Sequence, residues 1–263
     1  MKILVLIKQV PETTDVKIDP ETNTLKREGV KSIINPFDMY AIEEAVRIKE
    51  RSGGGQVIAV SMGPPQAMEA LREAISMGCD EAVLLSDKKF AGSDTWATSY
   101  TLSQAIRKLG DYSVVLCGKQ ASDGDTAQVG PGVSTHLDIP QVTYIKKIEQ
   151  INAESARVER MTEEGYEIIE TALPAVMTVV KEINEPRLPS LKGKMRAKKA
   201  EIPVWTAEDL LCDEEKIGLD GSPTRVIKVF TPPPRQGGRV LAGEPEAVSK
   251  ELADLLKDVV ISS

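Results

Sequence analysis

The sequence has few of the residues that build metal sites, disulfide frameworks and histidine-based active sites. Its three cysteines, Cys79, Cys117 and Cys212, lie far apart and include no Cys-x-x-Cys pair, which argues against a zinc site or a disulfide framework. We therefore interpret them as small buried hydrophobic residues. His136 is the only histidine, so a metal centre or a histidine-based catalytic triad is not expected.

Long apolar runs are also missing. No run of about eighteen apolar residues occurs, so no transmembrane helix and no membrane insertion are expected. The opening MKILVLIKQV has an apolar stretch too short for a signal peptide, and we interpret it as a buried strand of a cytoplasmic protein. The formal net charge of -7 disfavours general nucleic-acid binding but leaves room for a local basic patch.

The first half of the chain alternates strand and helix patterns. Apolar strand patterns occupy residues 3–7, 56–63, 81–86 and 114–117. Helical patterns occupy residues 35–50, 64–78, 93–110 and roughly 126–137, and Asn35 is a candidate cap for the first of them. This order predicts an α/β fold, a doubly wound parallel sheet with right-handed crossovers.

Ligands of such sheets bind beyond the carboxyl ends of the strands, where the strand order reverses. The candidate loops are those after Ile7, Val60, Leu85 and Cys117.

The pattern changes after Pro140. Residues 142–151, 156–162, 166–173 and 175–180 have strand patterns without long helices between them, and we expect antiparallel hairpins added to one edge of the sheet. Residues 184–203 are basic and weakly periodic, and residues 211–243 resemble a loop. The tail predicts one amphipathic helix with Val248, Leu252, Leu255 and Val259 on one face.

These changes predict two parts. Residues 1–200 would form the nucleotide-binding α/β domain, with its edge strands and a loop at about 184–200. Residues 201–263 would form an extended arm and a C-terminal helix, because so long a stretch with little structure suggests an arm that lies on another subunit.

The loop after Cys117, in VLCGKQASDGDTAQVGP, has the pattern of a phosphate site. A helix N-terminus offers unpaired amide groups and a partial positive charge, which bind phosphate without a lysine. Residues 126–129 would supply these amides, and Gly124 would let the backbone approach closely. Asp123 and Asp125 would then cap the helix, steady the turn or bind a ribose hydroxyl. A capped helix start that binds no ligand fits the same residues. The common GxxxxGK[ST] and GxGxxG motifs are absent.

Several segments together resemble the beta subunit of electron-transfer flavoproteins. They are NPFD at 35–38, VSMGP at 60–64, GKQASDGDTAQVGP at 118–131, ERMTEEGYEIIETALPAVMT at 159–178 and LPAVMTVVKEINEPRLPSLKGKMRAKKAEI at 173–202. The resemblance covers nearly the whole chain. It implies an adenine nucleotide in this subunit and an alpha subunit as partner, which carries a shuttling FAD.

The resemblance places the nucleotide at the strand-end loops that the sheet topology also selects. Backbone atoms near Leu6 and Met62 would read the adenine edge, and the helix end at Thr126 would hold phosphate. The cofactor-binding residues it implies are Leu6, Asn35, Pro36, Phe37, Asp38, Met62, Gly118, Lys119, Gln120, Ala121, Ser122, Asp123, Gly124, Asp125, Thr126, Ala127, Gln128 and Val129.

The family has one branch that holds AMP in this site and an electron-bifurcating branch that holds a second FAD there. FAGSDTWATSYTL at 90–102 resembles the bifurcating branch, in which a G-x-D-T-x-A-T element opens a helix, and KQVPETTDVKIDP at 8–20 resembles it too. We therefore expect FAD, with Asp94, Thr95 and Thr98 near the pyrophosphate or flavin ring. AMP is the alternative, and an ordinary helix cap would also explain residues 93–95.

The implied function is electron bifurcation. NADH would deliver a hydride to this FAD, and one electron would pass through the alpha-subunit FAD to a flavin dehydrogenase, either acyl-CoA dehydrogenase-like or of the lactate type. The other electron would pass to ferredoxin or flavodoxin. The chain would thus be an electron-transfer subunit of an NADH-dependent oxidoreductase complex. We assign no catalytic acid or base, because the cofactor does the chemistry.

Two other functions remain open. One is an AMP-binding, non-bifurcating beta subunit that passes electrons between acyl-CoA dehydrogenases and a quinone reductase. The other is a nucleotide-sensing binding module on the same scaffold. In the family, the basic segment is a recognition loop that docks the dehydrogenase through a leucine, which matches Leu191. An apolar anchor among charges suits that role, and a solvated loop is the other interpretation of this segment. We do not expect nucleic acid as a partner.

Overall fold

The computed structural model describes residues 1–12, 32–228, 238 and 240–260. The chain divides into two compact units, Met1–Ile227 and Lys228–Ser263. Most of the segment KQVPETTDVKIDP, from residue 13 onward, lies outside the described residues.

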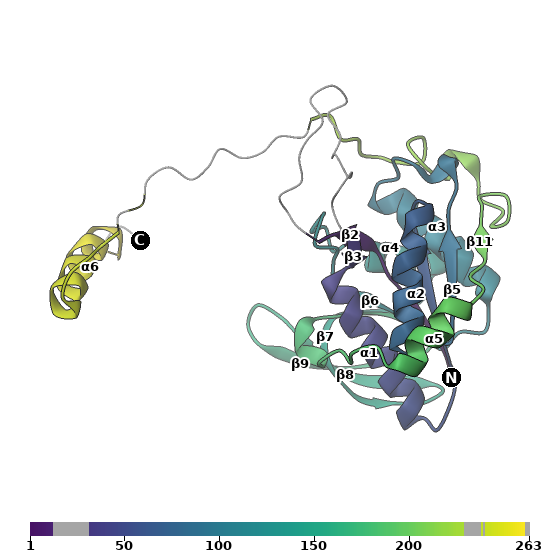
Figure 1. Ribbon diagram of the computed structural model, residues 1–263, viewed down its shortest axis with the longest axis horizontal. Coiled ribbons are helices and arrows are strands. Elements are labelled where there is room, and N and C mark those ends of the chain that lie inside the picture. The colour runs from purple at the N-terminus through teal and green to yellow at the C-terminus, as the bar shows by residue number, and fades with distance from the viewer. Residues whose placement is uncertain (13–31, 229–237, 239, 261–263) are drawn as a thin grey trace. The chain divides into compact units, whose positions relative to one another are not determined.

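A mostly parallel sheet forms the centre of the first unit (Figure 1). Within the described residues it has nine strands in the order β11-β5-β4-β1-β6-β10-β7-β8-β9. Neighbours from β11 to β7 are parallel, whereas β8 pairs antiparallel with both β7 and β9. The predicted fold class is therefore confirmed. The strands are β1 (Lys2–Leu6), β4 (Gln56–Met62), β5 (Glu81–Leu85), β6 (Val114–Gly118), β7 (Gln141–Ile151), β8 (Ser155–Met161), β9 (Tyr166–Ala172), β10 (Ala175–Val179) and β11 (Val204–Trp205).

Helices cover both faces of the parallel strands. Ile3 and Val5 of β1 pack in one core cluster with α1 (Pro36–Arg51) and α2 (Met68–Met77). Leu4 and Leu6 point to the opposite face and pack with α3 (Thr95–Leu109) and α4 (Val129–Leu137). Successive side chains of a strand point to opposite faces, so a strand covered on both faces is apolar throughout, as β1 is.

The strand order reverses at β1. From β1 the chain moves outward to β4 and then β5, and it returns through α3 to β6 on the other side of β1. The carboxyl ends of β1 and β6 therefore mark the switch point, where doubly wound sheets bind their ligands.

One predicted strand is misplaced. The expectation that residues 175–180 join the edge hairpins is wrong, because β10 lies between β6 and β7 and is parallel to both. All five of its residues are buried. Its unbroken apolar run, AVMTV, is the pattern of a strand covered on both faces and not of a half-exposed edge strand.

The structure also contains elements that the sequence patterns do not predict. β2 (Gln9–Pro11) pairs antiparallel with β3 (Ser32–Ile34). Residues expected as a loop form α5 (Leu191–Lys199), which lies against α2. A Cβ on Gly193 would lie 2.1 Å from the carbonyl oxygen of Ser76, so α5 contacts α2 through its backbone and shows little apolar periodicity. Short 3-10 turns are η1 (Pro65–Ala67), η2 (Lys88–Phe90), η3 (Lys181–Ile183) and η4 (Glu214–Lys216).

The start of the predicted arm contributes to the first unit. β11 pairs with β5, and Ala207, Leu210 and Ile217 are buried in the cluster that contains α3. The division of the chain at residue 200 stays a prediction.

The second unit contains α6 (Pro245–Val260), as the tail pattern predicts. Leu252, Leu255 and Leu256 are each about half exposed. The side chain of Val259 lies outside the described residues. No helix in the part of the chain that the structure describes could cross a membrane.

Candidate functional site

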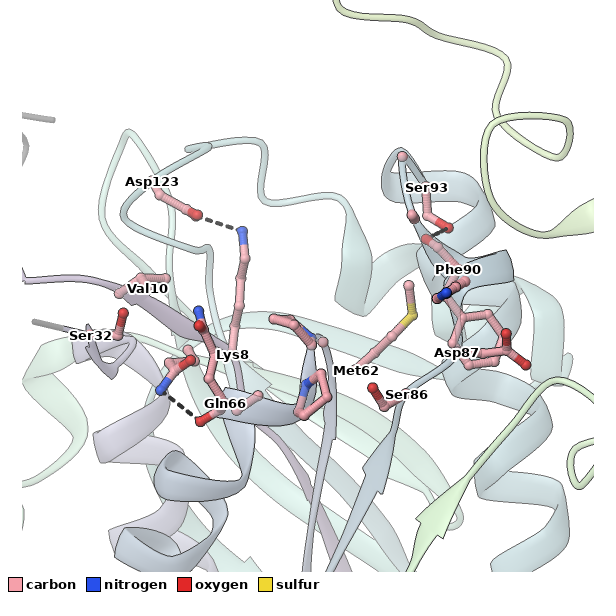
Figure 2. Close-up of a pocket in the computed structure, with 18 of the residues that line it drawn as sticks. Lys8, Val10, Ser32, Met62, Gln66, Ser86, Asp87, Phe90, Ser93 and Asp123 are labelled. Atoms are coloured by element: carbon pink, nitrogen blue, oxygen red, sulfur yellow. Dashed lines mark hydrogen bonds and ion pairs between the residues drawn. The ribbon is translucent and has the colours of Figure 1, made fainter. Parts of the chain in front are cut away.

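A pocket of about 740 Å³ opens at the carboxyl ends of the parallel strands (Figure 2). Pockets that hold small molecules and cofactors typically measure roughly 300–1,000 Å³. Residues 8–11 after β1, 62–67 after β4, residues between 86 and 93 after β5, and Asp123 after β6 line it, together with Ser32. All four loops that the topology selects therefore meet at this pocket.

The two ends of the pocket differ in chemistry. The apolar side chain of Met62 lies at one end, together with Phe90 and Ser86 (Figure 2). Lys8 and Asp123 lie at the other end, where their Nζ and Oδ1 atoms are 2.6 Å apart. A flat apolar group and an anionic group could therefore occupy opposite ends of one ligand.

Asn35 fastens the loop between β6 and α4. Its Nδ2 donates to the carbonyl oxygen of Gln120 at 2.8 Å, and its Oδ1 accepts from the amide of Ser122 at 3.0 Å. Asn35 occupies the cap position of α1, as predicted, but its side chain makes no capping hydrogen bond to the helix. The partners lie far away in sequence, and a local pattern does not reveal them.

Asp38 joins the ends of β1 and β6. Its buried carboxylate accepts from the amide of Lys8 at 2.8 Å and from the amide of Gly118 at 3.1 Å. Burial raises the pKa of Asp38 to about 7, against the opposing effect of these hydrogen bonds. A Cβ on Gly118 would lie 2.5 Å from the Cβ of Phe37, so only glycine fits beside this carboxylate.

Helix α4 begins later than predicted. It starts at Val129 and not at Thr126, because Asp125 and Ala127 have φ of 49° and 53°, in the left-handed region. Its cap position, Gln128, makes no side-chain cap. Within the described residues, the amides of 126–129 have no hydrogen-bond partner. The predicted phosphate-binding amides are therefore unpaired, although they belong mainly to an irregular turn.

The two acids of this loop bind protein groups and do not cap α4. Asp125 accepts from Nε2 of Gln120 at 2.6 Å, and Asp123 pairs with Lys8. These contacts explain how two acids can occur in a loop that is predicted to bind an anion. Each carboxylate has a partner of its own.

Asp94 is a helix cap, which was the ordinary alternative for this motif. Its Oδ1 accepts from the amides of Trp96 and Ala97 at 2.9 and 3.1 Å. Its Oδ2 accepts from the amide and hydroxyl of Thr224 at 3.0 and 2.8 Å. Thr95 donates through its hydroxyl to Oε1 of Gln128 at 2.8 Å, which ties α3 to the turn before α4.

Most predicted site residues thus surround the pocket without lining it. Met62 and Asp123 line it directly, whereas Leu6 and Asp38 are buried behind it. Asp94, Thr95 and Thr98, at the start of α3, are partly exposed and do not line the pocket. Sequence reasoning missed Lys8 as a lining residue, although its place directly after the first strand was a usable signal. The contacts of the predicted site residues with a cofactor stay predictions.

Leu191 lies on an exposed apolar and cationic surface. It is the first residue of α5 and is 77% exposed, with Leu188 at 89% and Met195 at 55%. We call these three residues the docking surface. The lysines of this segment are Lys192, Lys194, Lys198 and Lys199.

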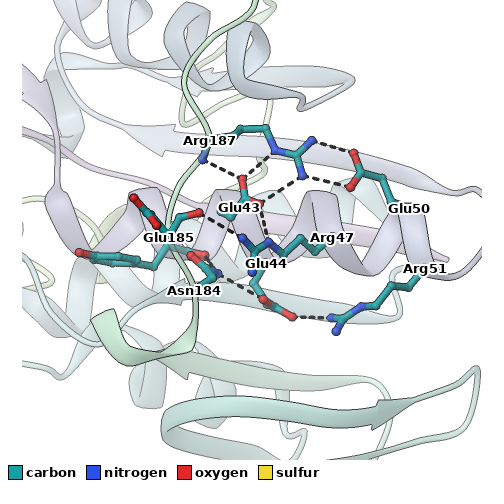
Figure 3. Close-up of polar contacts among 9 residues, drawn as sticks. Glu43, Glu44, Arg47, Glu50, Arg51, Asn184, Glu185 and Arg187 are labelled. Carbon is teal, nitrogen blue, oxygen red and sulfur yellow. Dashed lines mark hydrogen bonds and ion pairs between the residues drawn. The ribbon is translucent and has the colours of Figure 1, made fainter.

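Ion pairs of Arg187 and a hydrogen bond of Asn184 fix the segment before α5 to helix α1 (Figure 3). Arg187 donates from Nε to the buried Glu43 at 2.7 Å and from Nη1 to Glu50 at 2.7 Å. Glu44, also buried, pairs with Arg51 and accepts from Nδ2 of Asn184 at 3.2 Å. The docking surface is therefore carried by an anchored segment.

Comparison with known proteins agrees with this architecture. Residues 22–210 match the model of the electron transfer flavoprotein domain. The chain is 53% identical over 257 residues to the electron transfer flavoprotein subunit beta of Thermoanaerobacterium thermosaccharolyticum, covering 97% of this chain and 98% of the relative. It is 51% identical over 243 residues to the caffeyl-CoA reductase-Etf complex subunit CarD of Acetobacterium woodii, covering 92% of each. It is 43% identical over 269 residues to protein FixA of Sinorhizobium fredii, covering 100% of this chain and 93% of the relative. The chain belongs to the electron transfer flavoprotein family.

Proposed function

We propose that this chain is the beta subunit of an electron-bifurcating flavoprotein and that the strand-end pocket binds FAD. The observation that carries this proposal is the group of unpaired amides at 126–129, in the loop whose residue Asp123 lines a pocket at the switch point of the sheet. Backbone amides before a helix bind phosphate through their N–H groups and the helix dipole.

The residues present suit an adenine dinucleotide. The amides at 126–129 would hold a phosphate, and the apolar end around Met62 and Phe90 would take a ring system. The extension of the pocket from Asp123 to the loop before α3 supports FAD over the shorter AMP (Figure 2). A bound flavin would supply hydride acceptance and one-electron transfer, while this chain binds it, orients it and excludes water from it.

The proposed partners follow from the family. An alpha subunit would carry the second FAD, NADH would be the hydride donor, and ferredoxin or flavodoxin would take one of the two electrons. The other electron would reach a flavin dehydrogenase docked at Leu188, Leu191 and Met195, whose exposure leaves them free for a partner. The name of one relative, a caffeyl-CoA reductase complex subunit, supports a partner that acts on acyl-CoA compounds. We propose the cytoplasm as the compartment.

The nucleotide content of the purified complex tests this proposal. The chain is produced together with its alpha subunit, and the nucleotides released on denaturation are quantified by chromatography. Two FAD molecules for each heterodimer are expected. One FAD and one AMP would replace bifurcation by the non-bifurcating alternative. Absence of any adenine nucleotide from this chain would contradict both functions.

A further inference from the structure

We propose that Lys8 binds a phosphate of the nucleotide and that Asp123 holds the Lys8 side chain in place until the nucleotide displaces it. This inference rests on the proposed function, because it assigns a residue to the same pocket. It gives the acidic loop after β6 a role that neither helix capping nor ribose binding provides.

Lys8 has a fixed backbone and a side chain that extends along one end of the pocket. Its amide donates to the buried carboxylate of Asp38 at 2.8 Å, which anchors the main chain directly after β1. Its side chain extends to the loop after β6, where Nζ lies 2.6 Å from Oδ1 of Asp123 (Figure 2). Both residues line the pocket, so the ammonium group lies where a ligand can reach it.

The ammonium group of Lys8 contacts the loop that carries the unpaired amides. Asp123 precedes Thr126, the first residue of the group 126–129, by three residues. An anion held by those amides would therefore lie close to the group that Asp123 now binds. A lysine ammonium commonly supplies such a point charge to phosphate.

The ion pair is suited to partner exchange. The side chains of Lys8 and Asp123 are 49% and 24% exposed, and ion pairs that are open to water contribute little to stability. A phosphate offers more negative charge than one carboxylate and more acceptor oxygens. Exchanging Asp123 for phosphate therefore costs little and strengthens the hydrogen bond of Lys8.

The other acids near the pocket are already engaged. Asp125 accepts from Gln120. Asp87 accepts from the amides of Lys89 and Ala207, each at 3.0 Å. Asp123 is thus the acid that faces Lys8, and its removal changes the ligand site without breaking a backbone contact.

Four variants of the full chain, in complex with its alpha subunit, test the exchange by equilibrium titration with AMP and FAD after removal of bound nucleotide. Lys8→Met should weaken binding about tenfold and reduce its dependence on salt, because a phosphate contact is lost. Lys8→Arg should retain most of the affinity. Asp123→Asn should tighten binding about threefold, because the competitor of the phosphate is removed. Lys147→Met, which removes a lysine paired with Glu149 on the hairpins, is the matched control and should bind like the wild type.

The double variant Lys8→Met/Asp123→Asn separates exchange from a general charge effect. The gain in nucleotide affinity from Asp123→Asn should be smaller when Lys8 is replaced, because the Lys8–Asp123 ion pair is then already absent. Unchanged affinity in a folded Lys8→Met would overturn the proposal. So would a loss of affinity in Asp123→Asn, which would make Asp123 a ligand contact. If the wild type binds neither AMP nor FAD, the proposed function itself fails, and this inference fails with it.

Discussion

Asp38 joins the two strands at the switch point through one side chain. Its folded-state pKa is about 7, above the ordinary value of 3.8, because burial disfavours the charged form. Between pH 3.8 and about pH 7, the Asp38 side chain of the folded protein keeps a proton that the same side chain has lost in the unfolded chain. The contribution of this proton to stability is therefore complete below about pH 4 and lost as the pH rises through 7.

Asp38→Asn should remove this pH dependence. Relative to the variant, the wild type should lose on the order of 4 kcal/mol of unfolding free energy between pH 4 and pH 8. Urea denaturation of both proteins across that range measures the difference between their unfolding free energies. The contributions of the other titrating groups cancel in this difference. Parallel stability profiles for the two proteins would show that Asp38 titrates normally.

Leu191 provides a second test at a single residue. It is largely exposed, so Leu191→Ala should change the unfolding free energy by less than about 0.5 kcal/mol. If Leu191 inserts into a pocket of the dehydrogenase, the KM for that partner should rise about tenfold or more, with little change in kcat. Leu211→Ala is a control, because Leu211 is 84% exposed but lies outside the docking surface. Equal KM values for both variants would remove Leu191 from the interface.

At the scale of elements, Arg187 makes the ion pairs that join helix α1 to the segment before α5. Arg187→Ala would leave the buried Glu43 with Arg47 as its remaining ion-pair partner, at 2.5 Å, and should cost about 3 kcal/mol. Glu50→Gln removes the exposed half of the same contact and should cost less than about 1 kcal/mol. Thermal unfolding measures both.

Arg187 should also control the order of the docking segment. Hydrogen exchange of the amides between residues 184 and 191 should become faster in Arg187→Ala, while nucleotide binding stays as in the wild type. Equal exchange rates in the two proteins would mean that α5 and its contacts with α2 hold this segment without Arg187.

Elements with a regular pattern of apolar residues were predictable from the sequence. Features that depend on residues far away in the sequence were not. The apolar run of β1 and the helical period of α1 predicted both elements and the edge where the pocket lies. The same run in β10 was assigned to the edge because local pattern does not reveal strand order. The start of α4 was missed because left-handed conformations at Asp125 and Ala127 depend on the loop's own contacts, such as that of Gln120.

For the molecule as a whole, α6 presents leucines to solvent. Leu252, Leu255 and Leu256 are each about half exposed, which suits a helix that docks on another subunit. Replacing Leu252 and Leu255 with aspartate should weaken pairing with the alpha subunit at least tenfold in sedimentation experiments. The first unit should stay folded, because it is compact without α6. Unchanged pairing would place the subunit contact elsewhere.

The cap of α3 also has a mechanical consequence. Asp94 follows the pocket wall at Gly92 and Ser93, and it is bonded to Thr224, near the point where the chain leaves the first unit. A pull on residues 225–227 would thus reach the wall of the pocket through Asp94, and by reciprocity a ligand in the pocket would stabilise the contact with Thr224. Thr224→Val, which loses the hydroxyl hydrogen bond, should weaken this coupling.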